Sequence, residues 1–309
     1  MEHTNHKKTF LSFTVGELIA GTLLACFCAV IFWIEDSVVP KFHSAPEQQI
    51  AQQNFPNDKI ILSDGSLHAQ AAIVYDLTNK RVMFAENTEM QLPLASLTKL
   101  MTADVAMDTI AATGKISISK EAVATEGESG IKAGSVWRLI DLLKYALTVS
   151  SNDAMAAVAE SGGGDLFIKQ MNDKAKTLGL SQSYFLDSTG LDTTQTVSGG
   201  YGSAMDVAKL ASDVYLKYPE IFESTVQNGV TYSGTDNVVR GKPTAMPILD
   251  IPGLIGAKTG YTNLAGGNLV AVFDLSVGHP VVAVVLHSTV SGRFDDVRTL
   301  INATRAAQK

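Results

Sequence analysis

The sequence predicts a mixed α/β domain built mainly on an antiparallel sheet, with helices between its first and last strands. Two short apolar segments, 71–75 and 81–84, bracket a polar turn, which is typical of a β-hairpin. Near the other end, β-branched residues predict three more strands, at 253–261, 268–276 and 281–287. Because strands at both ends enclose helices, we expect the two terminal segments to share one sheet.

The helices are predicted from the spacing of apolar residues. The first follows Pro93 and carries apolar residues at 97, 100, 101, 105 and 107. Four further helices are expected at 136–147, 154–160, 206–215 and 294–307. Trp137, in the second helix, should pack in the core.

Length and charge limit the classes of protein that fit. The chain has 309 residues, which suits one large domain with appendages or at most two domains. Hydrophobic residues make up 46% and charged residues 18%, as in ordinary globular proteins. The net charge of −7 argues against binding to nucleic acid, since no basic face is present.

The N-terminus contains an uncharged apolar run at 18–34, preceded by basic residues and followed by acidic ones. Extended back to residue 10, the run is long enough to cross a membrane, which needs about 20 residues. The basic flank should stay inside. We therefore predict a cytoplasmic tail at 1–9, a transmembrane anchor at 10–34, a linker at 35–66 and a catalytic domain at 67–309 outside the cytoplasm, at the bacterial cytoplasmic membrane.

Three alternatives remain for this segment. It could be a cleaved signal peptide, although no good cleavage site follows the run. The residues before Cys26 loosely resemble a lipoprotein box, and residues 13–18 resemble the start of a pilin-like segment. Both cysteines, Cys26 and Cys28, lie within the apolar run. The exported part therefore contains no disulfide, thiol nucleophile or cysteine metal site.

Three short motifs could carry chemistry: Ser-Leu-Thr-Lys at 96–99, Ser-Ser-Asn at 150–152 and Lys-Thr-Gly at 258–260. Ser96 follows a proline at the start of a helix, and Lys99 lies one turn later on the same face. Serine is a poor nucleophile without a base, and lysine becomes a base only when its pKa is lowered. We expect burial and the nearby cation of Lys258 to lower it, and the helix N-terminus to stabilise an oxyanion.

Two other segments share the Ser-x-x-Lys pattern, at 117–120 and 129–132. Neither follows a proline at the start of an amphipathic helix. The pattern is common by chance, so we expect these two to be a solvated turn or surface strand. The order and spacing of the three motifs, rather than any single one, make the set specific.

With this trio the chain resembles the D-alanyl-D-alanine carboxypeptidase family of low-molecular-mass penicillin-binding proteins, whose signature it is. The resemblance covers roughly residues 68–305. It extends to the segments around the motifs and to others at 171–180, 189–192, 203–206 and 292–294. It implies a fold of the serine β-lactamase and D,D-peptidase type, in which helices flank the antiparallel sheet and a helical lobe is added.

The resemblance also implies roles. Ser96 would attack the carbonyl between two D-alanines and form an acyl-enzyme, and Lys99 would accept its proton. Ser150, helped by Lys258, would pass a proton to the leaving amine. The remaining family positions would bind substrate: Asn152 the peptide, Lys258, Thr259 and Arg293 the terminal carboxylate, and the backbone N–H groups of Ser96 and Tyr261 the oxyanion beside Gly260. The implied partners are a peptidoglycan stem peptide ending in D-Ala-D-Ala and β-lactam inhibitors, with no metal or cofactor.

The chain departs from the family pattern at Ser151, where the family usually has glycine. It also ends soon after the last predicted helix, as the endopeptidases of the family do, so cleavage of cross-links is an alternative to carboxypeptidase activity. A serine β-lactamase is disfavoured because no Glu-x-x-x-Asn pattern follows Gly164. A membrane-tethered β-lactam or muropeptide sensor is the non-enzymatic alternative.

Overall fold

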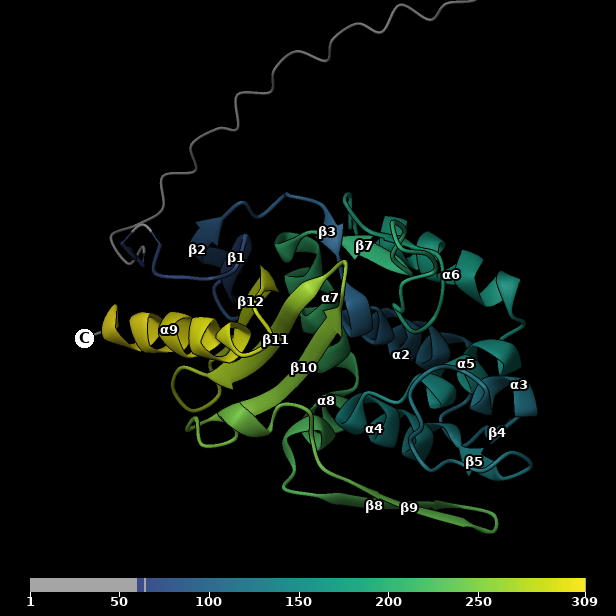
Figure 1. The fold of residues 1–309 in the computed structure, drawn as a ribbon. Helices are drawn as coiled ribbons and strands as arrows, with labels where there is room; N and C mark the ends of the chain where they lie inside the picture. The colour runs from purple at the N-terminus through teal and green to yellow at the C-terminus, as the bar shows by residue number, and fades with distance from the viewer. Residues whose placement is uncertain (1–59, 64, 309) are drawn as a thin grey trace, which may run out of the picture. The chain divides into compact units, whose positions relative to one another are not determined.

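The computed structural model describes residues 60–63 and 65–308. Its main sheet has five strands in the order β10-β11-β12-β1-β2, all antiparallel (Figure 1). The strands are β1 (Ala71–Asp76), β2 (Arg81–Glu86), β10 (Leu254–Thr262), β11 (Gly266–Asp274) and β12 (Pro280–Ser288). Strands from both ends of the described chain therefore form one sheet, as the sequence predicts.

The other elements lie mostly between these strands in sequence. The helices are α2 (Thr98–Thr109), α3 (Lys120–Val123), α4 (Leu139–Val149), α5 (Asn152–Ser161), α6 (Asp165–Thr177), α7 (Ala204–Lys217), α8 (Pro219–Glu223) and α9 (Gly292–Ala306), with 3-10 turns η1 (Ala95–Leu97), η2 (Ser224–Val226) and η3 (Met246–Ile248). The shorter strands are β3 (Leu92–Pro93), β4 (Lys115–Ser117), β5 (Val136–Arg138), β6 (Tyr184–Phe185), β7 (Gly200–Gly202), β8 (Val230–Gly234) and β9 (Asn237–Gly241).

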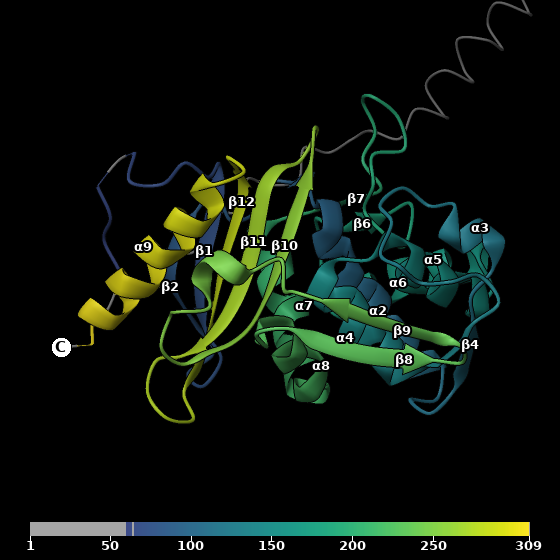
Figure 2. The ribbon, with the colours of Figure 1, turned by 60° about the horizontal axis from the view of Figure 1, so that its bottom comes forward.

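Both faces of the main sheet are covered. Helix α9 packs on one face, and α7 packs on the other, which also borders the remaining helices (Figures 1 and 2). Along β12, residues 281, 283 and 285 join the core under α9, while residues 282, 284 and 286 join the core of the helical region. Because successive side chains of a strand point to opposite faces, a strand covered on both sides needs an unbroken apolar run.

Two parts of the middle region differ from the prediction. The helix expected at 136–147 begins only at Leu139, since residues 136–138 form β5 and pair with β4. Trp137 is buried as predicted, but on this strand. Helix α6 and the β8–β9 hairpin, which runs along α4 (Figure 2), are not predicted from the sequence.

Among the residues that the structure describes, no helix is long and apolar enough to cross a membrane. The predicted anchor at 10–34 and the tail at 1–9 lie outside the described residues.

Candidate active site

Ser96 lies in the 3-10 turn η1, immediately before α2, rather than in the α-helix itself. The preceding residue, Ala95, has φ = 48°, a left-handed conformation that is rare for a residue with a side chain. Strand β10 passes this turn so closely that a Cβ at Gly260 would lie 2.8 Å from the carbonyl oxygen of Leu94. Glycine therefore lets the Lys-Thr-Gly strand run against the turn that carries the serine.

Lys99 lies one turn along α2, and its side chain is fully buried, with 0% exposed. Its Nζ donates hydrogen bonds to Ser96 Oγ (2.8 Å), Asn152 Oδ1 (2.6 Å) and the Thr189 carbonyl oxygen (2.7 Å). Burial lowers the pKa of Lys99 to about 7, although the carboxylates of Asp187 and Asp153 act in the opposite direction. A sizeable fraction of the amine is thus neutral near pH 7.

The three partners of Lys99 orient its lone pair once the amine loses a proton. A neutral amine keeps two N–H donors and one acceptor position. The oxygens of Asn152 and Thr189 can only accept, so they take the two N–H groups. The lone pair then faces Ser96 Oγ, whose hydroxyl can donate. This arrangement is that of a general base bonded to a nucleophile.

The second motif lies between α4 and α5. Ser150 ends α4 in a left-handed conformation, with φ = 63° and ψ = 38°. Asn152 begins α5, and besides accepting from Lys99 it donates from Nδ2 to the Glu126 carbonyl oxygen at 2.6 Å. The side chain of Asn152 therefore joins the base to a loop at 126–132.

Lys258, on β10, is also fully buried. Its Nζ donates to Ser150 Oγ at 2.8 Å and to the Thr259 carbonyl oxygen at 2.6 Å. Burial lowers its pKa well below the usual value, and the charges of Lys99 and Arg293 lower it further. Burial, one of the two causes predicted from the sequence for Lys99, is the main cause for both lysines, and the predicted effect of the Lys258 cation is not among the causes found for Lys99.

The rest of the third motif adjoins two residues distant in sequence. Thr259 Oγ1 donates to Thr244 Oγ1 at 2.7 Å, and Thr244 lies in the segment after β9. Arg293, at the start of α9, is 9% exposed and donates from Nη1 to the Gly260 carbonyl oxygen at 2.7 Å. Burial lowers the Arg293 pKa, but a guanidinium remains charged. Hydroxyls and a cation beside the edge of a sheet can bind a carboxylate.

The structure thus places the predicted residues in one region. Ser96, Lys99 and Asn152 form one hydrogen-bonded group, and Ser150 and Lys258 form another. Arg293 joins β10 through Gly260, while the half-exposed side chain of Tyr261 points away from the core.

No role was predicted from the sequence for Thr189, Thr244, Asp153 and Asp187, although Thr189 and Asp153 lie in segments that resemble the family. Each reaches the site through a backbone oxygen, a threonine hydroxyl or charge. Ser129 was expected in a solvated turn or surface strand. It lies in a loop, but it is half-buried and its hydroxyl bonds Asp153.

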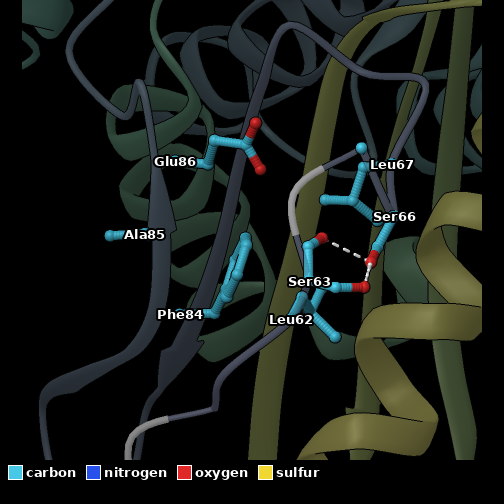
Figure 3. Close-up of a pocket in the computed structure, with 8 residues that line it drawn as sticks. Leu62, Ser63, Ser66, Leu67, Phe84, Ala85 and Glu86 are labelled. Carbon is cyan, nitrogen blue, oxygen red and sulfur yellow. Dashed lines mark hydrogen bonds between the residues drawn. The ribbon is translucent and has the colours of Figure 1, made fainter.

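A separate hollow of about 380 Å³ lies between residues 62–67 and β2 (Figure 3). Phe84 and Glu86 line it from β2, and the hydroxyls of Ser63 and Ser66 bond each other at 2.7 Å. No residue of the three motifs lines it. It offers no base next to a serine, so it is not a candidate for the chemistry described above. Within the described residues, no group of three or more His, Cys, Asp or Glu side chains could hold a metal ion.

A serine bonded to a buried lysine, at the start of a helix beside an antiparallel sheet, is the arrangement of an acyl-transferring serine hydrolase with a lysine base. The family comparison is more specific. Residues 58–289 match the model of peptidase family S11, described as D-alanyl-D-alanine carboxypeptidase. The chain belongs to this family.

Known relatives include both activities that the sequence analysis considered. A D-alanyl-D-alanine carboxypeptidase of Bacillus subtilis, DacF, is 36% identical over 208 residues, covering 64% of this chain and 52% of the relative. A D-alanyl-D-alanine endopeptidase of Escherichia coli is 32% identical over 216 residues, covering 67% of this chain and 68% of the relative. The chain spans only 52–62% of the length of three carboxypeptidase relatives, DacF of Bacillus subtilis and DacD of Escherichia coli and of Salmonella typhimurium.

The fold matches solved structures as well. Penicillin-binding protein D2 of Listeria monocytogenes, determined in its ampicillin-bound form, superimposes with a TM-score of 0.64 at 28% identity. The match covers 77% of this chain and 97% of that structure. The predicted fold of the D,D-peptidase type is therefore confirmed.

Proposed function

We propose that this protein is a serine D,D-peptidase that hydrolyses the terminal D-alanyl-D-alanine bond of peptidoglycan stem peptides through an acyl-enzyme. The observation that carries the proposal is the 2.8 Å hydrogen bond between Ser96 Oγ and the buried amine of Lys99. Family membership supports the substrate class, since relatives are named D-alanyl-D-alanine carboxypeptidases.

The order of steps follows from which groups in the site can give or take a proton. Ser96 Oγ attacks the carbonyl carbon of the penultimate D-alanine and passes its proton to Lys99. The C–N bond breaks, and the leaving amine takes a proton from Ser150, which Lys258 replenishes. Water then adds to the acyl carbonyl and gives a proton through Ser150 back to Lys258, while Ser96 Oγ leaves with the proton held by Lys99, so that the shortened peptide is released and the enzyme is restored. The backbone N–H groups of Ser96 and Tyr261 stabilise the oxyanion in both steps.

A carboxypeptidase must also bind the free carboxylate of its substrate. We assign this role to Thr259, Lys258 and Arg293, which lie along β10 or beside it. Asn152 would hold the peptide on the opposite side. A β-lactam carries a carboxylate and a strained amide, so it should acylate Ser96. The ampicillin-bound form of the Listeria protein supports this inhibitor class.

An endopeptidase that splits peptidoglycan cross-links is the second candidate. Its support is the Escherichia coli endopeptidase, which this chain matches over 68% of the relative's length, compared with 52% for DacF. The two activities share the acylation step and differ in the leaving group.

The test is to incubate the purified full chain with defined stem peptides and cross-linked dimers and to determine the product masses. Released D-alanine identifies a carboxypeptidase, and split dimers identify an endopeptidase. A benzylpenicillin adduct on Ser96 is expected by mass spectrometry, with no adduct and no turnover for Ser96→Ala. Turnover by that variant would disprove the proposal.

The pKa of Lys99 predicts how acylation varies with pH. The base must be neutral, so the second-order rate constant for penicillin should fall about tenfold per pH unit below pH 7, since the Lys99 pKa is about 7. Stopped-flow measurement from pH 5 to pH 8 tests this. A rate constant independent of pH across that range would exclude Lys99 as the base.

We also propose that the protein is a single-pass protein of the bacterial cytoplasmic membrane, with its catalytic domain outside. The support is the uncharged run at 18–34 and the basic residues before it. Alkaline phosphatase fused after residue 309 should be active in cells, and the protein should stay with the membrane fraction after carbonate washing. A protein released by that wash would contradict the anchor.

A further inference from the structure

The connection between α4 and α5 consists of only two residues, Ser150 and Ser151, and Asn152 follows as the first residue of α5. Ser150 and Asn152, which both act in the proposed mechanism, therefore lie on either side of Ser151. Ser150 has φ = 63°, which non-glycine residues rarely adopt without support from their surroundings. The positions of the Ser150 hydroxyl and the Asn152 amide therefore depend on whatever holds this turn.

A buried carboxylate lies directly behind the turn. Asp153 is 1% exposed, and it accepts hydrogen bonds from Ser129 Oγ at 2.7 and 2.8 Å and from the Ala154 amide at 2.9 Å. Ser151 Oγ also donates to Asp153 Oδ1, and it caps α5 by accepting from the Ala154 amide at 3.0 Å. A buried charge needs such donors, so they and the carboxylate hold one another in place.

The loop that supplies Ser129 is itself fixed from two sides. Tyr145 Oη donates to the Ser129 carbonyl oxygen at 2.6 Å. Asn237, at the tip of the β8–β9 hairpin, accepts from the Lys132 amide at 3.1 Å and donates to the Gly130 carbonyl oxygen at 3.2 Å. Figure 2 shows this hairpin reaching along α4 toward β4.

We propose that Asp153, held by Ser129 and Ser151, is a positioning residue for acylation that keeps Asn152 on the amine of Lys99 and Ser150 on the amine of Lys258. Asp153 touches neither substrate nor the reacting atoms. Asn152 directly precedes Asp153 in the chain. The loop that bonds Asp153 through Ser129 also accepts a hydrogen bond from Asn152 at the Glu126 carbonyl oxygen, and the Asn152 side chain accepts from Lys99. The inference rests on the proposed acylation of Ser96.

Asp153 has an electrostatic effect that a purely structural residue would lack. The charged groups that act on the Lys99–Lys258 pair are Asp153 on α5, Asp187 before the Thr189 turn, and Arg293 on α9. The carboxylate of Asp153 raises the Lys99 pKa against the effect of burial. Removing its charge should lower that pKa and move the acidic limb of the acylation profile to lower pH.

The test is the pH dependence of acylation by a fluorescent penicillin, from pH 5 to pH 8.5, for the full chain and for Asp153→Asn. We expect the plateau rate constant to fall by about tenfold to a hundredfold, because displaced catalytic groups lose that much. We also expect the midpoint of the acidic limb to move to lower pH. An unchanged midpoint together with a plateau within threefold of the parent value would overturn the inference.

Ser129→Ala separates charge from geometry and guards against misfolding of the first variant. It keeps the carboxylate but removes one donor, so the plateau should fall by at least about threefold while the midpoint stays in place. An unchanged plateau would remove Ser129 from the cluster. Ser203→Ala is the matched control, since Ser203 is another buried N-cap serine, which accepts from the Asp206 amide at 3.2 Å on α7. It should lose thermal stability and keep the parent profile. If the parent chain itself is not acylated, the proposed function fails, and not the positioning role.

Discussion

The main sheet and the polar seam of the candidate site bury side chains equally well but bury opposite kinds. On β12, residues 281–286 are all apolar and 0% exposed. In the seam, which we define as Lys99, Asp153, Lys258 and Thr259, every side chain is polar and at most 4% exposed. Burial of apolar surface stabilises the fold, at about 25 cal/mol per Å². Burial of an amine costs free energy and lowers its pKa, so a sizeable fraction of Lys99 is neutral near pH 7. The same exclusion of water thus gives stability in one region and an amine able to accept a proton in the other.

The largest effect should come from replacing the buried base. Lys99→Met should slow acylation by about a hundredfold to ten-thousandfold, because general base catalysis contributes that much. Thermal stability should not fall, since an apolar side chain of similar size avoids burying an amine. Acylation kinetics and calorimetry measure the two effects. Lys169→Met, at an exposed lysine of α6, is the control and should change neither. A Lys99→Met protein that is less stable than the parent but is acylated at the parent rate would contradict both expectations.

The corresponding change in the sheet should affect stability alone. Phe273 is fully buried under α9, so Phe273→Ala should lower the free energy of unfolding by about 3–5 kcal/mol. The acylation rate of the folded fraction should stay at the parent value. Urea denaturation and penicillin acylation at 15 °C test both points. Leu216→Ala, at an exposed leucine, is the control and should cost less than about 0.5 kcal/mol. Loss of acylation in folded Phe273→Ala would show that the two regions are not independent.

A buried carboxylate of the helical region sharpens the contrast with the seam. Asp104 on α2 lies 3.3 Å from Lys174 Nζ, yet burial raises its pKa to about 6. A raised carboxyl pKa means that the folded state binds the proton more tightly than the unfolded one, so stability falls as pH rises from about 4 to 6. The shift from 3.8 to about 6 corresponds to at most about 3 kcal/mol.

Asp104→Asn should remove this loss, and its advantage over the parent should grow by about 1–3 kcal/mol between pH 4 and pH 6.5. Urea denaturation at several pH values measures the difference. Comparison with the parent at each pH cancels the contribution of carboxylates distant from Asp104 whose pKa is lowered, such as Asp76. A constant difference across this range would show that folding does not raise the pKa of Asp104.

The smallest effect is expected for an exposed ion pair. Arg138 Nε lies 2.8 Å from Asp141 Oδ2, and the arginine side chain is 61% exposed. Arg138→Ala should change stability by less than about 1 kcal/mol, because water and salt screen such pairs. Denaturation at 0.05 M and 1 M salt provides the check. A larger loss would mean that Arg138 contributes to the start of α4 by a route other than this pair.

Local patterns predicted the sheet and its motifs well. The five main strands and α9 lie within a few residues of their expected positions because their apolar runs are long and bounded by turns. Residues 136–138 were assigned to a helix because apolar spacing continues from β5 into α4. Pairing of Trp137 with Ile116 decides that they form a strand. Helix α6 was missed although Phe167, Met171 and Ala175, its buried residues, recur every four positions.

The sequence by itself determined the family and the fold class and predicted the nucleophile and its partners within the three motifs, because these depend on residue type and short spacing. Only the tertiary structure decided how the motifs work together. It buries Lys99 beneath residues up to 90 positions away, which lowers its pKa, and it aligns three acceptors around one amine. It also places Ser129 behind Asp153. Burial and approach between distant segments are properties of packing, and no local pattern encodes them.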